Sequence, residues 1–526
     1  MGRAFGTVAR ATFILVAFNL ISKLLGYVRE AVIAYQFGTS ASYDAFLVAY
    51  SVPAVLFFII NGALTTAVIP VYSQYSSRDG EAEAWKLFGM VFNVLLVILL
   101  VLSALGVLLA PWLVKLLAPY FTGETEQMTV DMIRIMFPLL VFSGLAALFG
   151  GLLNARNIFG VTALNAPLTN LGIIASVLAL SAVWGVRGMA LGALVGGVAY
   201  ALVQVPSLLR SGFRFSRGFN LRHPGLKQIL VLMLPMAVSI SVSQTYVLVD
   251  RILASGLAEG SISALNYANR LIQMPLGLFV TAVGTAFFPT FTQRAADGNY
   301  AGLEDGIRRG LRVVILVCLP AAVGLMVLRD PIIALFLKRG AFDLRAAGMT
   351  QIALLFYSIG LIGQAAEFIL QRGFFSLQDT VTPLKLGLVV VGVNLALSLL
   401  LIRPLQHGGL ALANSIASLT SMVLLIFFLG RRLTGFWNLE MWRFGGLTVL
   451  ASGVMGLVVY AVNSQSWFGA LHLGNAVTAL VQLGMAIGCG LVVYVVMLSL
   501  LRFEESKLVW GAVGRVLGRF GGGRRG

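Results

Sequence analysis

Charged side chains stand inside long apolar stretches of this chain, where they could bind an anion. Lys23, Arg29 and Glu30 lie within the first such stretch. Arg270, beside Asn269, lies in a later one. A charge near the centre of a bilayer-spanning helix costs roughly 2.5–3.5 kcal/mol on insertion scales, so such groups usually face a cavity or a partner. Because arginine holds phosphate groups through paired hydrogen bonds, these residues predict a cationic cavity for a phosphate or pyrophosphate.

Acidic residues accompany these cations. Asp44 begins the second apolar stretch, and we expect it to pair with Arg29. Asp250 lies deep in the seventh stretch, where an ionisable group is functional by default. Asp379 follows the tenth stretch, and residues near such ends often only snorkel to the membrane surface or form structural ion pairs.

Catalytic motifs are absent from the sequence. It has no phosphate-binding P-loop, no HExxH and no GxSxG pattern. The two cysteines, Cys318 and Cys489, lie in apolar runs without metal-ligand spacing. The chain is therefore not expected to be an enzyme or to need a metal, and transport would be driven by an ion gradient, the membrane potential or the substrate gradient.

The composition predicts an all-α polytopic membrane protein. The 526 residues are 59% hydrophobic and only 11% charged, whereas soluble domains are about 25% charged. A helix of about 20 apolar residues crosses a bilayer, and prolines such as Pro53, Pro70, Pro235, Pro275 and Pro289 are expected to break or kink the longer stretches. Fourteen transmembrane helices are predicted, over residues 10–36, 43–75, 85–110, 129–155, 160–184, 187–210, 226–255, 261–292, 308–328, 346–371, 381–403, 408–430, 442–462 and 474–501.

Basic residues predict the orientation. Of 37 lysines and arginines, 25 fall on one side of the predicted membrane and 7 on the other. The positive-inside rule then places both termini in the cytoplasm. This asymmetry accounts for the net charge of +17 without nucleic acid as a partner, and the basic loop and tail are also suited to contact anionic membrane lipids.

An internal repeat divides the chain. Residues 1–211 resemble residues 225–432: Ile69-Pro70-Val71 has a counterpart in Phe288-Pro289-Thr290, and Gly185-Val186-Arg187-Gly188 in Gln406-His407-Gly408-Gly409. Parallel repeats place the substrate path between two lobes that rock against each other. The predicted parts are an N-lobe (1–211), a basic cytoplasmic linker (212–225), a C-lobe (226–432), two further helices (433–501) and a basic cytoplasmic tail (502–526).

Several motifs together resemble the MurJ (MviN) family. They are Ser22-Lys23-Leu24-Leu25-Gly26-Tyr27-Val28-Arg29-Glu30 with Asp44-Ala45-Phe46, then Tyr267-Ala268-Asn269-Arg270-Leu271, and Gln378-Asp379-Thr380-Val381-Thr382-Pro383. This family belongs to the multidrug/oligosaccharidyl-lipid/polysaccharide (MOP) exporter superfamily. The resemblance implies a lipid II flippase of the bacterial cytoplasmic membrane. It would move the undecaprenyl-pyrophosphate-linked peptidoglycan precursor to the outer leaflet by alternating access for cell-wall synthesis.

The resemblance also implies roles for particular residues. Lys23, Arg29, Glu30, Asp44, Asn269 and Arg270 would bind substrate. Asp250, Asp379 and Asn394 would hold a coupling ion such as Na⁺, with membrane-potential coupling as the other option and no further cofactor. Residues 433–501 would form the groove for the lipid tail, and the protein would act as a monomer that cell-wall synthases could contact.

The sequence departs from the family at two positions in the second stretch. An arginine usual after Pro53 is absent, and a glutamate usual before Gly62 is Asn61. A flippase for another polyprenyl-pyrophosphate-linked glycan and a cation-coupled multidrug exporter of the same fold therefore stay open at this point.

Overall fold

A computed structural model describes residues 21–156, 158–213, 218, 220, 222–433, 439–464 and 475–501. Within these residues every regular element is a helix, and twelve helical stretches are long and apolar enough to cross a bilayer. The predicted all-α, multi-pass architecture is therefore confirmed. Residues 10–20 of the first predicted span lie outside the described residues, although residues 21–37 form a helix. The count of fourteen spans stays a prediction.

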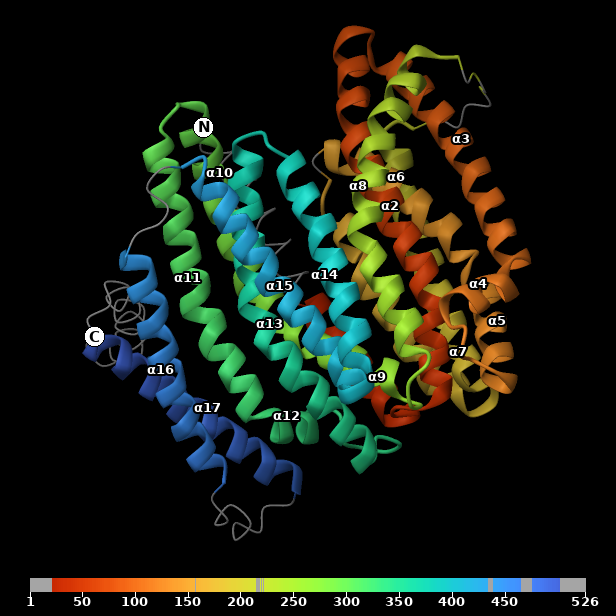
Figure 1. Ribbon diagram of the computed structural model, residues 1–526. Coiled ribbons are helices and arrows are strands. Elements are labelled where there is room, and N and C mark those ends of the chain that lie inside the picture. The colour runs from red at the N-terminus through yellow and green to blue at the C-terminus, as the bar shows by residue number, and fades with distance from the viewer. Residues whose placement is uncertain are drawn as a thin grey trace, which may run out of the picture. The chain divides into compact units, whose positions relative to one another are not determined.

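The chain forms two compact units, which are described separately (Figure 1). The first unit comprises residues 1–264 and 339–346, and the second comprises residues 265–338 and 347–526. After the helix over 21–37, the first unit contains α2 (Ala41–Arg78), α3 (Glu81–Leu108), α4 (Ala110–Leu117), α5 (Gly123–Met136), α6 (Leu139–Ala155), η1 (Thr162–Leu164), α7 (Asn165–Arg210) and α8 (Pro224–Ala254).

The second unit begins within α9. It contains most of α9 (Ser261–Pro275), then η2 (Leu276–Val280), α10 (Thr281–Ala296), α11 (Tyr300–Val327), α12 (Arg329–Phe336), most of α13 (Leu344–Ser376), α14 (Val381–Leu405), α15 (His407–Gly430), α16 (Leu439–Asn463) and α17 (Asn475–Leu500). Helix α8 thus groups with the first unit, where it packs against α2. The predicted N-lobe and C-lobe were defined by the sequence repeat, and that division stays a prediction.

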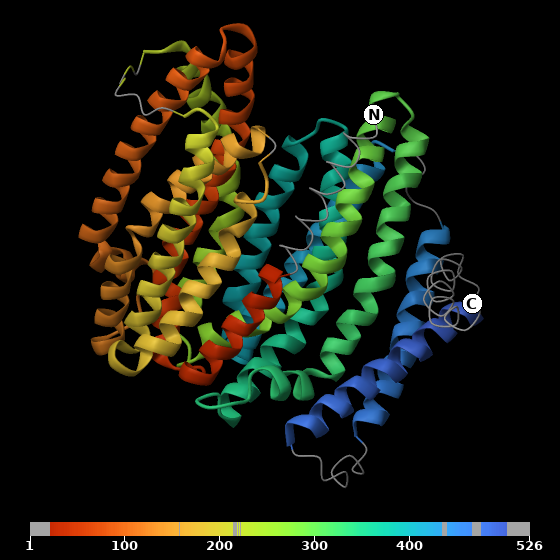
Figure 2. The ribbon, with the colours of Figure 1, turned by 180° about the vertical axis from the view of Figure 1, so that it is seen from behind.

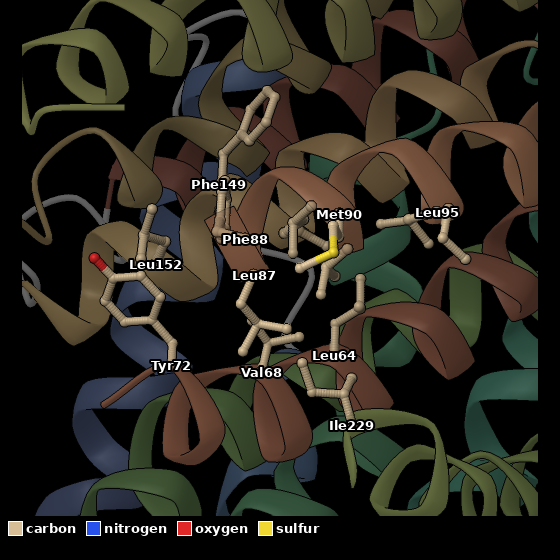
Figure 3. Close-up of a cluster of buried hydrophobic side chains, with 14 of the residues drawn as sticks. Leu64, Val68, Tyr72, Leu87, Phe88, Met90, Leu95, Phe149, Leu152 and Ile229 are labelled. Atoms are coloured by element: carbon tan, nitrogen blue, oxygen red, sulfur yellow. The ribbon is translucent and has the colours of Figure 1, made fainter. Parts of the chain in front are cut away.

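The core of the first unit forms where α2, α3, α6 and α8 meet (Figure 3). On α3, Leu87, Val91 and Val94 recur at helical spacing and are buried, as expected for one face of a helix. Leu100 and Val101 on the same helix are exposed. An apolar exposed face on a helix of this length is the face that contacts lipid.

A tight turn folds α7 back on itself. Gly185 has φ 53° and ψ −136°, at the point where the predicted spans 160–184 and 187–210 part. A methyl group on Gly172 would lie 2.6 Å from the Gly192 carbonyl oxygen, so the two arms of α7 are antiparallel and closely packed. Gln406, between α14 and α15, has nearly the same angles, φ 51° and ψ −132°. The repeat that paired these two segments by sequence therefore has a matching backbone turn.

The prolines do not break the helices, and the predicted kinks stay a prediction. A π-helical turn, η2, follows Pro275, but Pro53, Pro70, Pro235 and Pro289 lie inside uninterrupted α-helices. Neighbouring helices and side chains can satisfy the carbonyl that a proline leaves without a donor, which is why membrane helices tolerate proline.

One such carbonyl anchors the last two helices. Pro320 in α11 has no N–H, so it cannot bond the carbonyl of Leu316 one turn earlier. The hydroxyl of Tyr494 on α17 donates to that carbonyl at 2.7 Å in a buried position. Helix α16 packs beside α17 (Figure 2), and a methyl group on Gly456 would lie 2.6 Å from Val323 of α11. The predicted spans 442–462 and 474–501 are these two helices, docked on α11.

Candidate functional site

Arg29 and Glu30 form the charged centre of the first unit. The Arg29 guanidinium pairs with the Glu30 carboxylate and donates to Asn170 Oδ1 at 3.0 Å. Glu30 also accepts from the Tyr43 hydroxyl at 3.2 Å, and Glu30 is only 5% exposed. In the part of the chain that is described, Arg29 Nε has no hydrogen-bond partner. The structure therefore brings two predicted site residues together and leaves one arginine donor available.

Asn170 positions this pair, and the sequence did not single it out. Its side chain lies over Gly26, where an added methyl group would be 3.7 Å from Nδ2. Nδ2 also donates to the Ser22 carbonyl at 3.3 Å. Asn170 therefore joins the helix over 21–37 to α7. Its signal in the sequence was a polar amide within an apolar span, the kind of residue that bonds between membrane helices.

The predicted pairing of Asp44 with Arg29 is wrong. Asp44 instead accepts from the backbone N–H groups of Gly260 and Ser263, each at 2.7 Å, and from the Ser263 hydroxyl. These donors form the N-terminus of α9, whose unpaired N–H groups and partial positive charge favour a carboxylate. Asp44 thus acts as a cap for another helix.

A second carboxylate, that of Glu259, caps α2 in the same way. Glu259 accepts from the N–H of Ala41 at 2.8 Å, at the start of α2. Arg345 donates to the Glu259 carbonyl at 3.1 Å, and the N–H of Ala341 donates to the Tyr35 carbonyl at 2.8 Å. Residues 339–346 are therefore bound to the first unit, although they connect two helices of the second.

The remaining predicted substrate residues are accessible. Lys23 is half-buried on the helix over 21–37. Arg270 is exposed and Asn269 half-buried on α9, in the part that belongs to the second unit. Since the two units are described separately, the convergence of Arg270 with Lys23 and Arg29 stays a prediction.

Two of the three predicted coupling-ion residues, Asp379 and Asn394, do not share one site. Asp379 accepts from the N–H of Thr382 at 2.9 Å and from its hydroxyl at 2.6 Å, and it pairs with Arg432 at 2.7 Å. It therefore caps α14. Asn394 lies 13 residues along that continuous helix, about 20 Å away at 1.5 Å per residue, so a single ion cannot contact both residues.

Burial alone would raise the pKa of Asp379. Hydrogen bonds from Thr382 and the nearby positive charge of Arg432 outweigh it and hold that pKa below its ordinary value. The carboxylate is therefore ionised and engaged in holding the start of α14.

Unsatisfied polar atoms mark the other two coupling-ion candidates. Asp250 Oδ1 is buried without a hydrogen-bond partner among the described residues. The same holds for Asn394 Nδ2 and for Ser398 Oγ, one helical turn further along α14. No group of three His, Cys, Asp or Glu side chains that could hold a metal occurs in the described part of the chain. An alkali cation would have to rest on mixed carboxylate, amide and hydroxyl oxygens.

The last two helices line an open apolar cavity of about 480 Å³. Its walls are aliphatic side chains with one glycine and one cysteine: Val458, Val462, Met485, Gly488, Cys489, Val492 and Val493. Such a lining can accept a hydrocarbon segment but offers nothing to a charged group.

Comparisons with known proteins agree with one another. The family model described as "Lipid II flippase MurJ" matches residues 33–481. A lipid II flippase MurJ from Burkholderia cenocepacia is 33% identical over 441 residues, 82% of this chain and 84% of that protein. A probable lipid II flippase MurJ from Vibrio cholerae is 30% identical over 515 residues, 95% of this chain and 97% of that protein.

Solved structures have the same fold. A lipid II flippase MurJ in an inward closed conformation has a TM-score of 0.80 and 25% identity, and the match covers 94% of this chain and all of that one. An inward-facing multidrug resistance MATE family transporter of the MOP superfamily has a TM-score of 0.66 at 14% identity, covering 81% of this chain and 98% of its own. The second likeness concerns the fold alone.

Proposed function

This chain belongs to the MurJ family of lipid II flippases, and from that premise we propose how its residues move lipid II from the inner to the outer leaflet of the bacterial cytoplasmic membrane. The chain is a multi-pass transporter and not an enzyme. Its substrate, lipid II, supplies peptidoglycan synthesis, and alternating access between two lobes is the proposed mode of transport.

The Arg29–Glu30 pair carries the proposal for the head group. A guanidinium balanced by an adjacent carboxylate is stable without substrate. The Arg29 Nε, which has no partner among the described residues, still offers a donor. A diphosphate bears more negative charge than Glu30 and can take two arginine donors in parallel. We propose that the diphosphate displaces the Glu30 carboxylate from Arg29, while Asn170 keeps the guanidinium in place.

Other predicted residues would complete the head-group site. Lys23 adds a second cation on the same helix, and Arg270 with Asn269 would contribute from the other unit. Asp44 supports this site indirectly, because its bonds to Gly260 and Ser263 fix the start of the helix that carries Arg270.

The cavity between α16 and α17 would take part of the polyprenyl tail. Its apolar lining matches a hydrocarbon chain, and the head-group residues lie on other helices. The tail would thus stay in an apolar environment while the charged head group crosses between the lobes. The hydrocarbon tail then avoids water, and the charged head group avoids the lipid interior.

Coupling to Na⁺ or to the membrane potential is the proposed energy source. Asp250 and Asn394, with Ser398 beside it, are the candidates. Asp250 Oδ1 and Ser398 Oγ are buried oxygens without a partner among the described residues, and Asn394 would contribute its amide oxygen. Asp379 keeps the structural role of a helix cap.

Both termini are proposed to face the cytoplasm, on the strength of the basic-residue asymmetry. The basic linker and tail would then meet anionic lipids of the inner leaflet. A monomer that cell-wall synthases can approach is the proposed working form.

Two other substrates are not favoured. Relatives with 30–33% identity over most of the chain are named as lipid II flippases, while the multidrug transporter likeness is only 14% identical. A centre built on Arg29 also suits an anionic head group better than a cationic drug.

Purified protein in lipid vesicles tests the proposal. Arg29→Ala and Arg270→Ala should each abolish lipid II translocation while the protein still inserts, and Arg431→Ala should have little effect because that side chain stacks on Phe427 at 4.5 Å. Depletion in the host should leave the lipid-linked disaccharide-pentapeptide on the inner leaflet. Wild-type transport by both cavity variants would refute the assignment.

A further inference from the structure

Helices α13 and α15 meet along a seam of small residues. A methyl group on Gly360 would lie 2.6 Å from the Ser415 Cα, and one on Gly363 would lie 2.6 Å from the Ser418 carbonyl carbon. The Ser415 hydroxyl donates to the Phe356 carbonyl at 2.6 Å across this seam. Small residues allow membrane helices to approach this closely, and such contacts have no slack for an added group.

Glu367 stands at one end of this seam and has only neutral partners. Its Oε1 accepts from Gln371 Nε2 at 2.9 Å, and its carboxyl group bonds to the Ser421 hydroxyl of α15. Among the described residues no cation lies within ion-pair distance of it. It lies nine residues, about 13 Å, from the end of α13 inside a stretch long enough to span the membrane.

Charged groups on the helices around Glu367 are engaged elsewhere. On its own helix, Arg372 stacks on the Phe368 ring at 3.5 Å and donates to the Phe368 carbonyl. Lys385, near the start of α14, is exposed. The others have these partners: Arg294 of α10 with the Gly302 carbonyl, Arg308 of α11 with Glu304, Arg312 of α11 with Glu440, His407 of α15 with the Met349 carbonyl, and Arg431 after α15 with Phe427.

We propose that Glu367 is a proton-binding site, neutral in this structure, whose proton loss loosens the contact between α13 and α15. An ionised carboxylate without a cation is unfavourable at this depth unless water reaches it. The side chain is half-buried rather than sealed, so a proton can exchange. Once ionised, the group would draw water toward Ser421, at the end of a seam that has no room for it.

Infrared difference spectroscopy of the purified protein tests the protonation state. The wild type minus the Glu367→Gln variant should show the C=O stretching band of a protonated carboxyl group, shifted in D₂O. Glu124→Gln is the matched control, because Glu124 is an exposed residue of α5 and should contribute only carboxylate bands. A difference spectrum for Glu367 that contains only carboxylate bands at neutral pH would overturn the proposal.

Hydrogen exchange measured by mass spectrometry tests the loosening. After correction for the intrinsic effect of pH, amide exchange in α13 and α15 should rise several-fold from neutral to mildly alkaline solution in the wild type. It should stay constant in Glu367→Gln, which keeps the size and hydrogen bonds of the protonated form. Glu367→Asp should restore the pH dependence. Equal pH dependence in the wild type and Glu367→Gln would count against the proposal, whether or not lipid II is the cargo.

Discussion

Tyr494→Phe should loosen the two C-terminal helices from the rest of the second unit. The change removes only the hydroxyl that donates to the Leu316 carbonyl at 2.7 Å. That carbonyl has no alternative donor within α11, because the residue one turn later is Pro320. The ring itself, at a position 8% exposed, keeps its packing.

The expected cost is about 1–2 kcal/mol, since a buried carbonyl is left without a partner. It should appear in the free energy of unfolding from an SDS titration of the purified protein. Tyr460→Phe is the matched control, because Tyr460 on α16 is 64% exposed and should cost almost nothing.

A double-mutant cycle isolates the proposed cause. Pro320→Ala restores an N–H that can bond the Leu316 carbonyl within α11. In that background Tyr494→Phe should lose at least about 0.5 kcal/mol of its effect, the size of coupling seen between residues that share a partner. The reasoning is refuted if the tyrosine substitution costs the same with and without the proline, or costs nothing in either.

Three further results are expected. Asp44→Ala should lower the free energy of unfolding by about 1–2 kcal/mol, as the loss of a helix cap does, and an unchanged SDS midpoint would contradict the capping role. Because φ is positive at both Gln406 and Gly185, glycine is favoured at each position. Gln406→Gly should therefore stabilise the protein, and Gly185→Ala should destabilise it, each by about 1 kcal/mol. Shifts of the same sign in thermal unfolding would contradict this expectation. Asp379 has a lowered pKa, so its contribution is present above the ordinary value of about 3.9 and is lost as pH falls through the folded value. Asp379→Asn should therefore lose less stability than the wild type below about pH 4 in acid titrations, and equal losses would exclude the carboxylate as the cause.

The membrane helices could be predicted from sequence because their signal is local. Long apolar stretches and basic loops locate spans without knowledge of any partner. Even the turn at Gly185 was implied, since two spans were predicted where one long helical element, α7, folds back on itself.

The partners of the buried charges could not be predicted in this way. Asp44 was assigned to Arg29 because both are charged and near in sequence, whereas the start of α9, over 200 residues away, offers three donors at once. Helix termini attract carboxylates as strongly as side chains do. Asn170 and Tyr43, which hold the Arg29–Glu30 pair, carry no charge and so stood out little from their apolar surroundings.

The binding of residues 339–346 to the first unit has a consequence for dissecting the molecule. The polypeptide passes between the units after residues 264, 338 and 346, and none of these points lies in the basic linker. Cutting the gene at that linker would give two fragments that are not independent folding units, because α8 would be severed from the helices on which it packs. Coexpressed fragments would have to rebuild the first unit from both polypeptides before either could function.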